Sequence, residues 1–258
     1  MSSSASAPTP PSCRVRIDVV GALRAAAAAL ALSVCGASLA APNLDGFWTV
    51  KFERKPSGQA LIDELPKAAV RINDTGAGEL AAGDFAGLHL KQAAVDQVRN
   101  YDYSQELKRE NTCVPPSVVF YMQAPFPMEI YQSRELIVFK MEYFDMYRVV
   151  FLDGRPHPPD RAPHSKSGFS TGRWDGDTLV VETSHIESGT FMNNGFNHSD
   201  HIRLSERFRL SPDGNTLWLT QVYEDPEVFD GVAARYMAWT RKPGEFVLPY
   251  ECDPSYGE

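Results

Sequence analysis

Residues 168–186 read GFSTGRWDGDTLVVETSHI, which is two strand-like runs joined by a tight turn. The first run, GFSTGRW, ends at Asp175-Gly176, and the second, DTLVVETSHI, is rich in β-branched residues. Because Asp and Gly both tolerate a positive φ, this pair is a strong signal for a two-residue hairpin connection. The stretch therefore predicts a β-hairpin.

Strand patterns continue on both sides of this hairpin. Residues 45–52, DGFWTVKF, alternate between apolar and polar positions and predict an early strand. The other runs are MEIYQ (128–132), ELIVFKMEYF (135–144), MYRVVFLD (146–153), HIRLSERFRL (201–210), NTLWLTQVYE (215–224) and ARYMAWTR (234–241). Short strands in this number, separated by turn residues, predict a mainly β fold, an antiparallel barrel or sandwich. Two irregular insertions, 154–167 and 187–200, interrupt it and are expected to form loops at one mouth.

The chain begins with the features of a secretory signal peptide. Three arginines precede the apolar run AAAAALALSVCGASLA (25–40), which ends in small residues. This predicts cleavage after Ala40, export to the periplasm or beyond, and one mature domain over residues 41–258. Within that domain, residues 59–112 carry helical spacing in QALIDEL and LKQAAVDQV, so we expect short helices and loops packed on the barrel.

The mature chain is acidic. Removing residues 1–40 takes away three arginines and one aspartate, so 25 basic and 33 acidic residues become 22 and 32, and the formal charge of −8 becomes −10. Such a chain, without a basic cluster, does not predict nucleic-acid binding. No later segment predicts a membrane span.

Cys113 and Cys252 are the cysteines that remain after removal of residues 1–40. In an exported chain they predict a disulfide, and two separate thiols are the alternative.

Gly46-Phe47-Trp48 resembles the glycine-x-tryptophan opening of lipocalin-like barrels, in which the Trp closes one end of the barrel. The chain also resembles a large set of exported bacterial proteins with no settled activity. The resemblance lies in four motifs that occur in this order: FLDGRPHP, GFSTGRWDGDTLVVET, HSDHIRLSERF and EDP. The resemblance covers roughly residues 113–252 and implies a lipocalin-like β-barrel rather than a function. That set usually has Gly-His-Ser before GRW, whereas this chain has Gly168-Phe169-Ser170. A shared mechanism that needs this histidine is therefore not implied here.

Glu206 stands on the apolar face of HIRLSERFRL, among Ile202, Leu204, Phe208 and Leu210. A carboxylate there is costly unless it is paired, hydrogen-bonded or protonated. In a filled barrel we expect a structural ion pair with an arginine, for which the candidates are Arg148, Arg173 and Arg235. Beside a cavity, the same group would be a general acid or base. A β-bulge that swaps the faces would instead place it on the surface.

His198 is the best single histidine for proton transfer at the barrel mouth, although a solvated loop histidine is an equal alternative. His185 shares a face with Leu179 and Val181, so we expect it to point inward near His198. His198 and His201 are three residues apart, but residues at that spacing on a strand point to opposite faces. We therefore predict no metal site.

Several arginines and aromatic residues are candidates for holding a substrate. Arg155 in LDGRPHP either anchors a carboxylate or braces Asp153, and we favour the brace. The strand aromatics mostly predict core packing, and some of them are expected to line a pocket. The full set of predicted substrate-binding residues is Arg207, Arg173, Arg155, Tyr147, Trp218 and Tyr223.

Motifs for nucleotide binding, phosphate binding and several hydrolase classes are absent from the sequence, which favours cofactor-independent chemistry. We expect an enzyme of the lyase, isomerase or dehydratase type that acts on a hydrophobic or aromatic small molecule, with Glu206, His198 and His185 in the site. A carrier for such a molecule is the second hypothesis, and an interaction module of the cell envelope is the third. A homodimer stays open.

Overall fold

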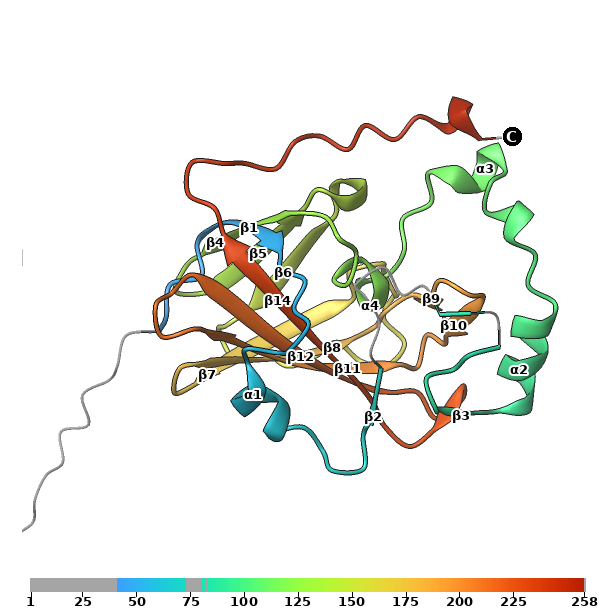
Figure 1. Ribbon diagram of the computed structural model, residues 1–258, viewed down its shortest axis with the longest axis horizontal. Coiled ribbons are helices and arrows are strands. Elements are labelled where there is room, and N and C mark those ends of the chain that lie inside the picture. The colour runs from blue at the N-terminus through green and yellow to red at the C-terminus, as the bar shows by residue number, and fades with distance from the viewer. Residues whose placement is uncertain (1–40, 73–79, 82, 258) are drawn as a thin grey trace, which may run out of the picture. The chain divides into compact units, whose positions relative to one another are not determined.

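The computed structural model describes residues 41–72, 80–81 and 83–257, and its main feature is a closed nine-stranded β-barrel (Figure 1). The barrel strands, in sheet order, are β1 (Gly46–Val50), β4 (Met128–Gln132), β5 (Leu136–Met141), β6 (Tyr147–Phe151), β7 (Phe169–Asp175), β8 (Thr178–Ser184), β11 (Arg203–Leu210), β12 (Thr216–Glu224) and β14 (Ala233–Arg241). Pairing between β1 and β14 closes the barrel. The predicted mainly β, lipocalin-like barrel is thus confirmed.

One neighbouring pair in the barrel is parallel, which the prediction of an antiparallel barrel did not include. β6 and β7 run in the same direction, with Val150 opposite Ser170 and Phe151 opposite Thr171. A parallel pair needs a crossover connection, and residues 152–168 provide it. The first irregular insertion therefore has a topological role.

The β7–β8 hairpin forms where the sequence predicts it, with the turn one residue later than Asp175-Gly176. Asp175 pairs with Thr178, so Gly176 and Asp177 are the turn residues. Gly176 has φ +62°, and Asp177 is not among the residues with positive φ. A positive φ at the first turn position alone is the arrangement of a type II′ turn, which favours glycine there.

Side chains fill the barrel interior. Alternation along β11 and β12 turns Leu204, Phe208, Leu219 and Tyr223 inward, and all four are fully buried. Trp48, Phe139 and Trp239 are buried to the same degree. Aromatic rings of this size bury about 150–250 Å² each and leave little room between them.

Trp48 lies in β1 near one end of the barrel, opposite Arg241 at the end of β14. Its indole nitrogen donates a hydrogen bond to the carbonyl of Leu44 over 2.9 Å. The guanidinium of Arg241 lies 4.4 Å from the ring centroid. Arg241 also donates to the carbonyls of Asn43 and Asp45, so it fastens the entering chain over this end.

Short elements cover the other end. Residues 187–200, which we expected to be an irregular loop, contain a small hairpin of β9 (Gly189–Met192) and β10 (Phe196–His198). Phe191 and Phe196 of this hairpin are fully buried and lie 4.9 Å apart between ring centroids, so burial of these rings stabilises the short strands. The other elements of the domain are α1 (Gln59–Asp63), β2 (Val70–Arg71), β3 (His89–Leu90), α2 (Gln92–Arg99), η1 (Tyr103–Gln105), α3 (Arg109–Thr112), α4 (Val118–Tyr121), η2 (Tyr143–Asp145), β13 (Phe229–Asp230) and η3 (Pro254–Tyr256).

Cys113 and Cys252 form the predicted disulfide. The segment after β14 runs back across the domain to α3, where the bond ties it down (Figure 1). The predicted signal peptide lies outside the described residues. Over the part of the chain that the structure describes, no helix has the length and apolar character needed to span a membrane.

Reduction of the disulfide should lower the free energy of unfolding by about 2–5 kcal/mol, because the bond closes a loop of 139 positions that contains most of the barrel. Urea unfolding of the oxidised protein, the reduced protein and the double variant Cys113→Ser/Cys252→Ser would measure this. The last two should agree with each other. Equal midpoints for all three would contradict the expectation.

Candidate functional site

Glu206 lies inside the barrel in an ion pair with Arg148, and both side chains are completely buried. Arg148 Nη1 donates to Glu206 Oε1 over 3.1 Å, and Arg148 Nη2 contacts Oε2. Gln221 Nε2 donates to Oε1 over 3.0 Å. The face predicted for Glu206 is therefore correct. Its carboxylate oxygens are occupied by these donors, so we assign it no catalytic role.

Arg148 uses its remaining donors on two hydroxyl groups. Its Nε donates to Ser170 Oγ over 3.1 Å, and its Nη2 donates to Thr183 Oγ1 over 2.8 Å. Burial disfavours the charged guanidinium, but the Glu206 carboxylate outweighs this effect and the pKa of Arg148 is raised. Of the three candidate arginines, Arg148 is therefore the partner of Glu206. Arg173 is paired with Asp175 on the surface, and Arg235 donates to the carbonyl of Phe191.

His185 does not point into the barrel, and this prediction is wrong. β8 ends at Ser184, and His185 has φ +55°, so the alternation stops one residue before it. Its Nδ1 contacts Ser184 Oγ at 2.7 Å, and its Nε2 contacts the carbonyl of Pro159 at 3.0 Å. His157 Nδ1 contacts the same Ser184 hydroxyl at 2.7 Å. His185 thus fastens the 154–167 crossover to the barrel rather than approaching His198.

The predicted substrate-binding arginines lie outside the barrel. Arg207 pairs with Glu64 over 2.9 Å, and Arg173 lies beside Asp175 at 3.8 Å. Arg155 braces Asp153 through its Nε at 2.9 Å and stacks on Phe151 at 3.7 Å from the ring centroid. The bracing role that we favoured for Arg155 is therefore the one observed.

The predicted substrate-binding aromatics do not converge either. Tyr147 is 55% exposed on the outer surface. Trp218 faces outward and donates through Nε1 to Ser57 Oγ over 2.9 Å. Tyr223 points inward, is fully buried and donates its hydroxyl to Gln221 Oε1 over 2.7 Å. The six predicted substrate contacts thus form no common pocket.

His198 forms a buried pair with a serine that the sequence analysis did not single out. His198 Nε2 lies 2.6 Å from Ser117 Oγ, and His198 Nδ1 lies 2.8 Å from the carbonyl of Ser199. A carbonyl only accepts, so Nδ1 carries the proton and Nε2 accepts from the Ser117 hydroxyl. The serine is 0% exposed and the histidine 2%. A serine after two prolines at a helix start is the one local signal for Ser117, and it indicates only a cap.

Burial lowers the pKa of His198 to about 4. The Ser199 carbonyl and the carboxylates of Asp225 and Asp200 favour the charged form, whereas Lys166 disfavours it. Loss of hydration outweighs the favourable contacts, so the imidazole is neutral near pH 7. A neutral imidazole that accepts a hydrogen bond from a hydroxyl is the form that a general base requires.

A pocket of about 400 Å³ lies directly beside this pair. Pro116 and Asn197, the residues that precede Ser117 and His198, line it, as does Gly189. A Cβ atom placed on Gly189 would lie 3.8 Å from His198 Nε2 and 3.9 Å from the backbone nitrogen of Ser117. The pair is therefore one residue behind the pocket wall.

Four of the residues that line this pocket are aromatic. They are Tyr101, Phe120, Tyr143 and Phe144. Phe144 has φ +53° and ψ +26°, in the left-handed region that a bulky residue rarely occupies. Such strain costs of order 1–3 kcal/mol and tends to occur at ligand-binding positions. The pocket also has many polar side chains, among them Glu106, Lys166 and Asn193, so it combines aromatic and polar surface.

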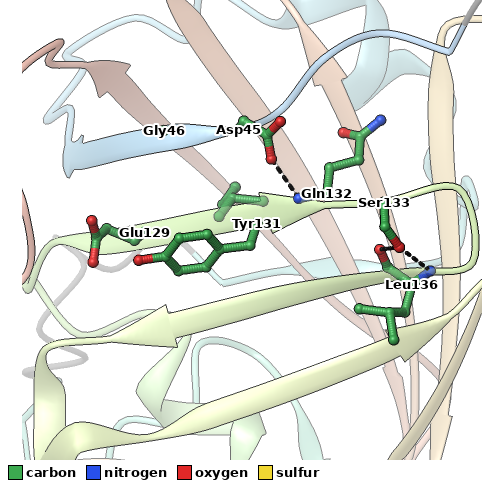
Figure 2. Close-up of a pocket in the computed structure, with 8 residues that line it drawn as sticks. Asp45, Gly46, Glu129, Tyr131, Gln132, Ser133 and Leu136 are labelled. Atoms are coloured by element: carbon green, nitrogen blue, oxygen red, sulfur yellow. Dashed lines mark hydrogen bonds between the residues drawn. The ribbon is translucent and has the colours of Figure 1, made fainter. Parts of the chain in front are cut away.

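A second hollow, of similar volume, lies on the outer surface of β4 beside β1 (Figure 2). Asp45 accepts a hydrogen bond from the backbone of Gln132 there, and the Ser133 hydroxyl accepts one from Leu136. The Tyr131 ring extends along the strand toward the Glu129 carboxylate (Figure 2), and burial together with a hydrogen bond to Glu129 raises the pKa of Tyr131. No histidine lines this hollow, so it offers less chemistry than the pocket beside His198.

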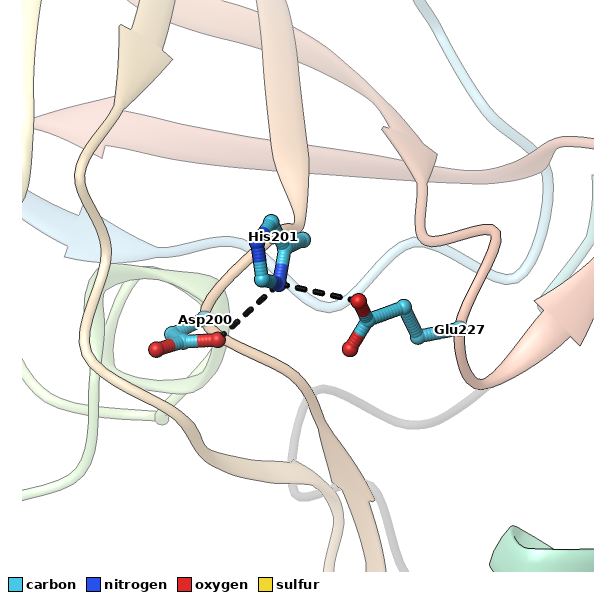
Figure 3. Close-up of side chains that lie close together, drawn as sticks. All are labelled: Asp200, His201 and Glu227. Atoms are coloured by element: carbon cyan, nitrogen blue, oxygen red, sulfur yellow. Dashed lines mark ion pairs between the residues drawn. The ribbon is translucent and has the colours of Figure 1, made fainter. Parts of the chain in front are cut away.

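Asp200, His201 and Glu227 are the one group of metal-type side chains that converge among the described residues (Figure 3). His201 Nδ1 lies 3.2 Å from Asp200 Oδ1 and 3.1 Å from Glu227 Oε1. All three residues are exposed. Two exposed carboxylates that pair with one imidazole would have this geometry without a metal ion. Nothing else at this cluster indicates a ligand. His198 takes no part in it, because its ring nitrogens bind Ser117 and Ser199.

Comparison of the chain with protein-family models and with curated proteins gives no match. The candidate site therefore depends on its geometry alone.

Removing one partner of the buried ion pair should destabilise the fold strongly. Glu206→Gln leaves the Arg148 charge without a counter-charge, which costs about 3–5 kcal/mol. The double variant Arg148→Met/Glu206→Gln should lose much less than the sum of the single variants Arg148→Met and Glu206→Gln, since Ser170 and Thr183 also bond each other at 2.9 Å. Urea unfolding of all three variants measures the coupling. Additive losses would exclude a structural pair.

The buried imidazole should make the protein acid-sensitive. A pKa near 4 in the folded state and about 6.5 in the unfolded state means that the unfolded state binds the proton more tightly. The contribution of neutral His198 to the free energy of unfolding is complete above pH 6.5. It falls by about 3 kcal/mol as the pH drops to about 4. His198→Asn should remove this part of the pH dependence, whereas His201→Gln, at an exposed position, should retain it. Urea unfolding at pH 4, 5.5 and 7 tests the difference.

Proposed function

We propose that this protein is an exported enzyme that carries out cofactor-independent acid–base chemistry, of the lyase or isomerase type, on a small hydrophobic or aromatic molecule. The substrate binds in the pocket between β9 and η2, and His198 acts as the base. The observation that carries this proposal is the contact of 2.6 Å between His198 Nε2 and Ser117 Oγ, directly behind the wall of the pocket.

Two properties of His198 support the role of base. Its tautomer is fixed by the Ser199 carbonyl, so the acceptor nitrogen is turned toward Ser117. Burial lowers its pKa to about 4, which keeps that nitrogen unprotonated at neutral pH and makes it a weaker base than a solvated imidazole. Asp225 accepts hydrogen bonds from both the backbone nitrogen and the hydroxyl of Ser199, at 2.7 and 2.8 Å, which holds the orienting carbonyl in place.

The proposed location of the protein is the periplasm or the exterior of the cell. The leader in residues 1–40 supports export. The Cys113–Cys252 disulfide is typical of an oxidising compartment.

A carrier role is the second candidate, and the complete burial of Ser117 favours it. In that case the Ser117–His198 contact satisfies two buried polar groups, and the aromatic residues of the pocket only retain a ligand.

The test is incubation of the purified protein with a panel of small phenols, aromatic esters and hydroxylated terpenoids. Native mass spectrometry reports what stays bound, and chromatography reports what is changed. We expect turnover that His198→Asn lowers at least 100-fold, with His201→Gln as the matched histidine control. Ligand that is retained unchanged by wild type and by His198→Asn alike would support the carrier instead.

A further inference from the structure

We infer that Ser117 is a nucleophile and that the pocket accepts carboxylic esters with an aromatic or apolar group, which the protein hydrolyses through an acyl-serine. This inference rests on the proposed role of His198 as base, but it assigns that base to ester hydrolysis in place of a lyase or isomerase reaction, and it names the substrate class. It starts from the arrangement of three groups in a row: the Ser117 hydroxyl, the His198 imidazole and the Ser199 carbonyl.

The arrangement satisfies the geometry of an activated nucleophile. Nucleophile and base are within hydrogen-bond reach, and a third group orients the base, which is the common logic of serine hydrolases on unrelated folds. Here a backbone carbonyl takes the position that a carboxylate usually holds. Asp225 holds this carbonyl indirectly, because it binds both polar groups of Ser199.

The two chemical steps balance without a cofactor. In the first, the Ser117 hydroxyl proton passes to His198 Nε2, Oγ bonds to the ester carbonyl carbon, and the bond to the alcohol oxygen breaks as that oxygen takes the proton. In the second, water gives a proton to Nε2 and attacks the acyl carbon, the bond to Oγ breaks, and the proton returns to Ser117. Water is the only co-reactant.

The surroundings can stabilise the negative charge that develops on the carbonyl oxygen. A Cβ atom placed on Gly189 would lie 3.8 Å from His198 Nε2 and 3.9 Å from the backbone nitrogen of Ser117, so a substrate atom at this position would lie close to both the base and an N–H group. Lys166 lines the pocket and acts to lower the pKa of His198, and its ammonium group pairs with Glu187 over 3.0 Å. A backbone N–H group and a nearby cation are the usual means of oxyanion stabilisation.

Access to the serine requires a small displacement of Gly189 and its neighbours. β9 is hydrogen-bonded in a ladder only to β10, and neither strand belongs to the barrel. Opening the pocket wall at this hairpin would keep every strand pair of the barrel and would act against the hydrogen bond from Arg235 to the Phe191 carbonyl. Gly189 itself has no side chain to cross the path.

The experiment uses the full chain and two probes, 4-nitrophenyl acetate and a fluorophosphonate. We expect a burst of about one 4-nitrophenol per protein molecule, and both probes should modify Ser117, as located by peptide mass spectrometry. Ser117→Ala should lose the burst and the adduct. Gly189→Val, whose side chain would stand in the path to Nε2, should lower the labelling rate at least 100-fold with an unchanged circular dichroism spectrum.

Ser184→Ala is the matched control, since Ser184 also contacts a histidine but lies away from the pocket. It should keep both the burst and the Ser117 adduct. Modification of Ser184 or of no serine at all would overturn the inference, and mapping in the wild-type chain gives this answer even if Ser117→Ala does not fold. Turnover that depends on His198 without any adduct would leave the proposed acid–base function standing and refute the nucleophile alone.

Discussion

The ion pair between Arg148 and Glu206 constrains the barrel, because neither charge is tolerated among Phe139, Phe208 and the other apolar interior residues without a full set of partners. The pair spans strands that are not neighbours in the sheet, β6 and β11, and so crosses the interior. The other groups that bind the pair belong to Ser170, Thr183 and Gln221. Each of these residues lies on a barrel strand and points inward because side chains alternate along a strand. The interior therefore holds a polar network inside an apolar shell, in which the charges of Arg148 and Glu206 are paired and hydrogen-bonded.

This network also determines where the candidate site lies. Glu206 binds Gln221, Gln221 accepts from Tyr223, and the Tyr223 hydroxyl lies 3.4 Å from Gln123 Nε2, just beyond the end of α4. The Gln123 side chain also donates to the carbonyl of Val119 within α4. Because α4 starts directly after Ser117, the position of the serine relative to His198 follows from contacts that begin at the ion pair. The contacts that begin at the ion pair thus reach α4, the helix whose N-cap residue is Ser117.

The sequence predicts the secondary-structure elements better than the tertiary contacts between them. Alternation predicts the barrel strands, and the apolar neighbours of Glu206 predict its inward position, because both depend on residues within a few positions. Which arginine meets Glu206 depends on the order of strands across the barrel, which local pattern does not contain. His185 was misplaced because a positive φ ends the strand before it, and Ser117 was missed because its partner is 81 residues away.

In this fold the barrel interior stabilises the structure, whereas the candidate site lies at the mouth of the barrel. The interior polar groups are occupied by one another, so a substrate that entered there would have to break the contacts that hold the strands in place. At the mouth, the β9–β10 hairpin has its own ladder, so opening it breaks no strand pair of the barrel, although it exposes the buried rings of Phe191 and Phe196. A buried pair that is reached by moving such a hairpin keeps water away from the imidazole, which explains its depressed pKa. The same burial that hides Ser117 therefore keeps His198 in the form of a base.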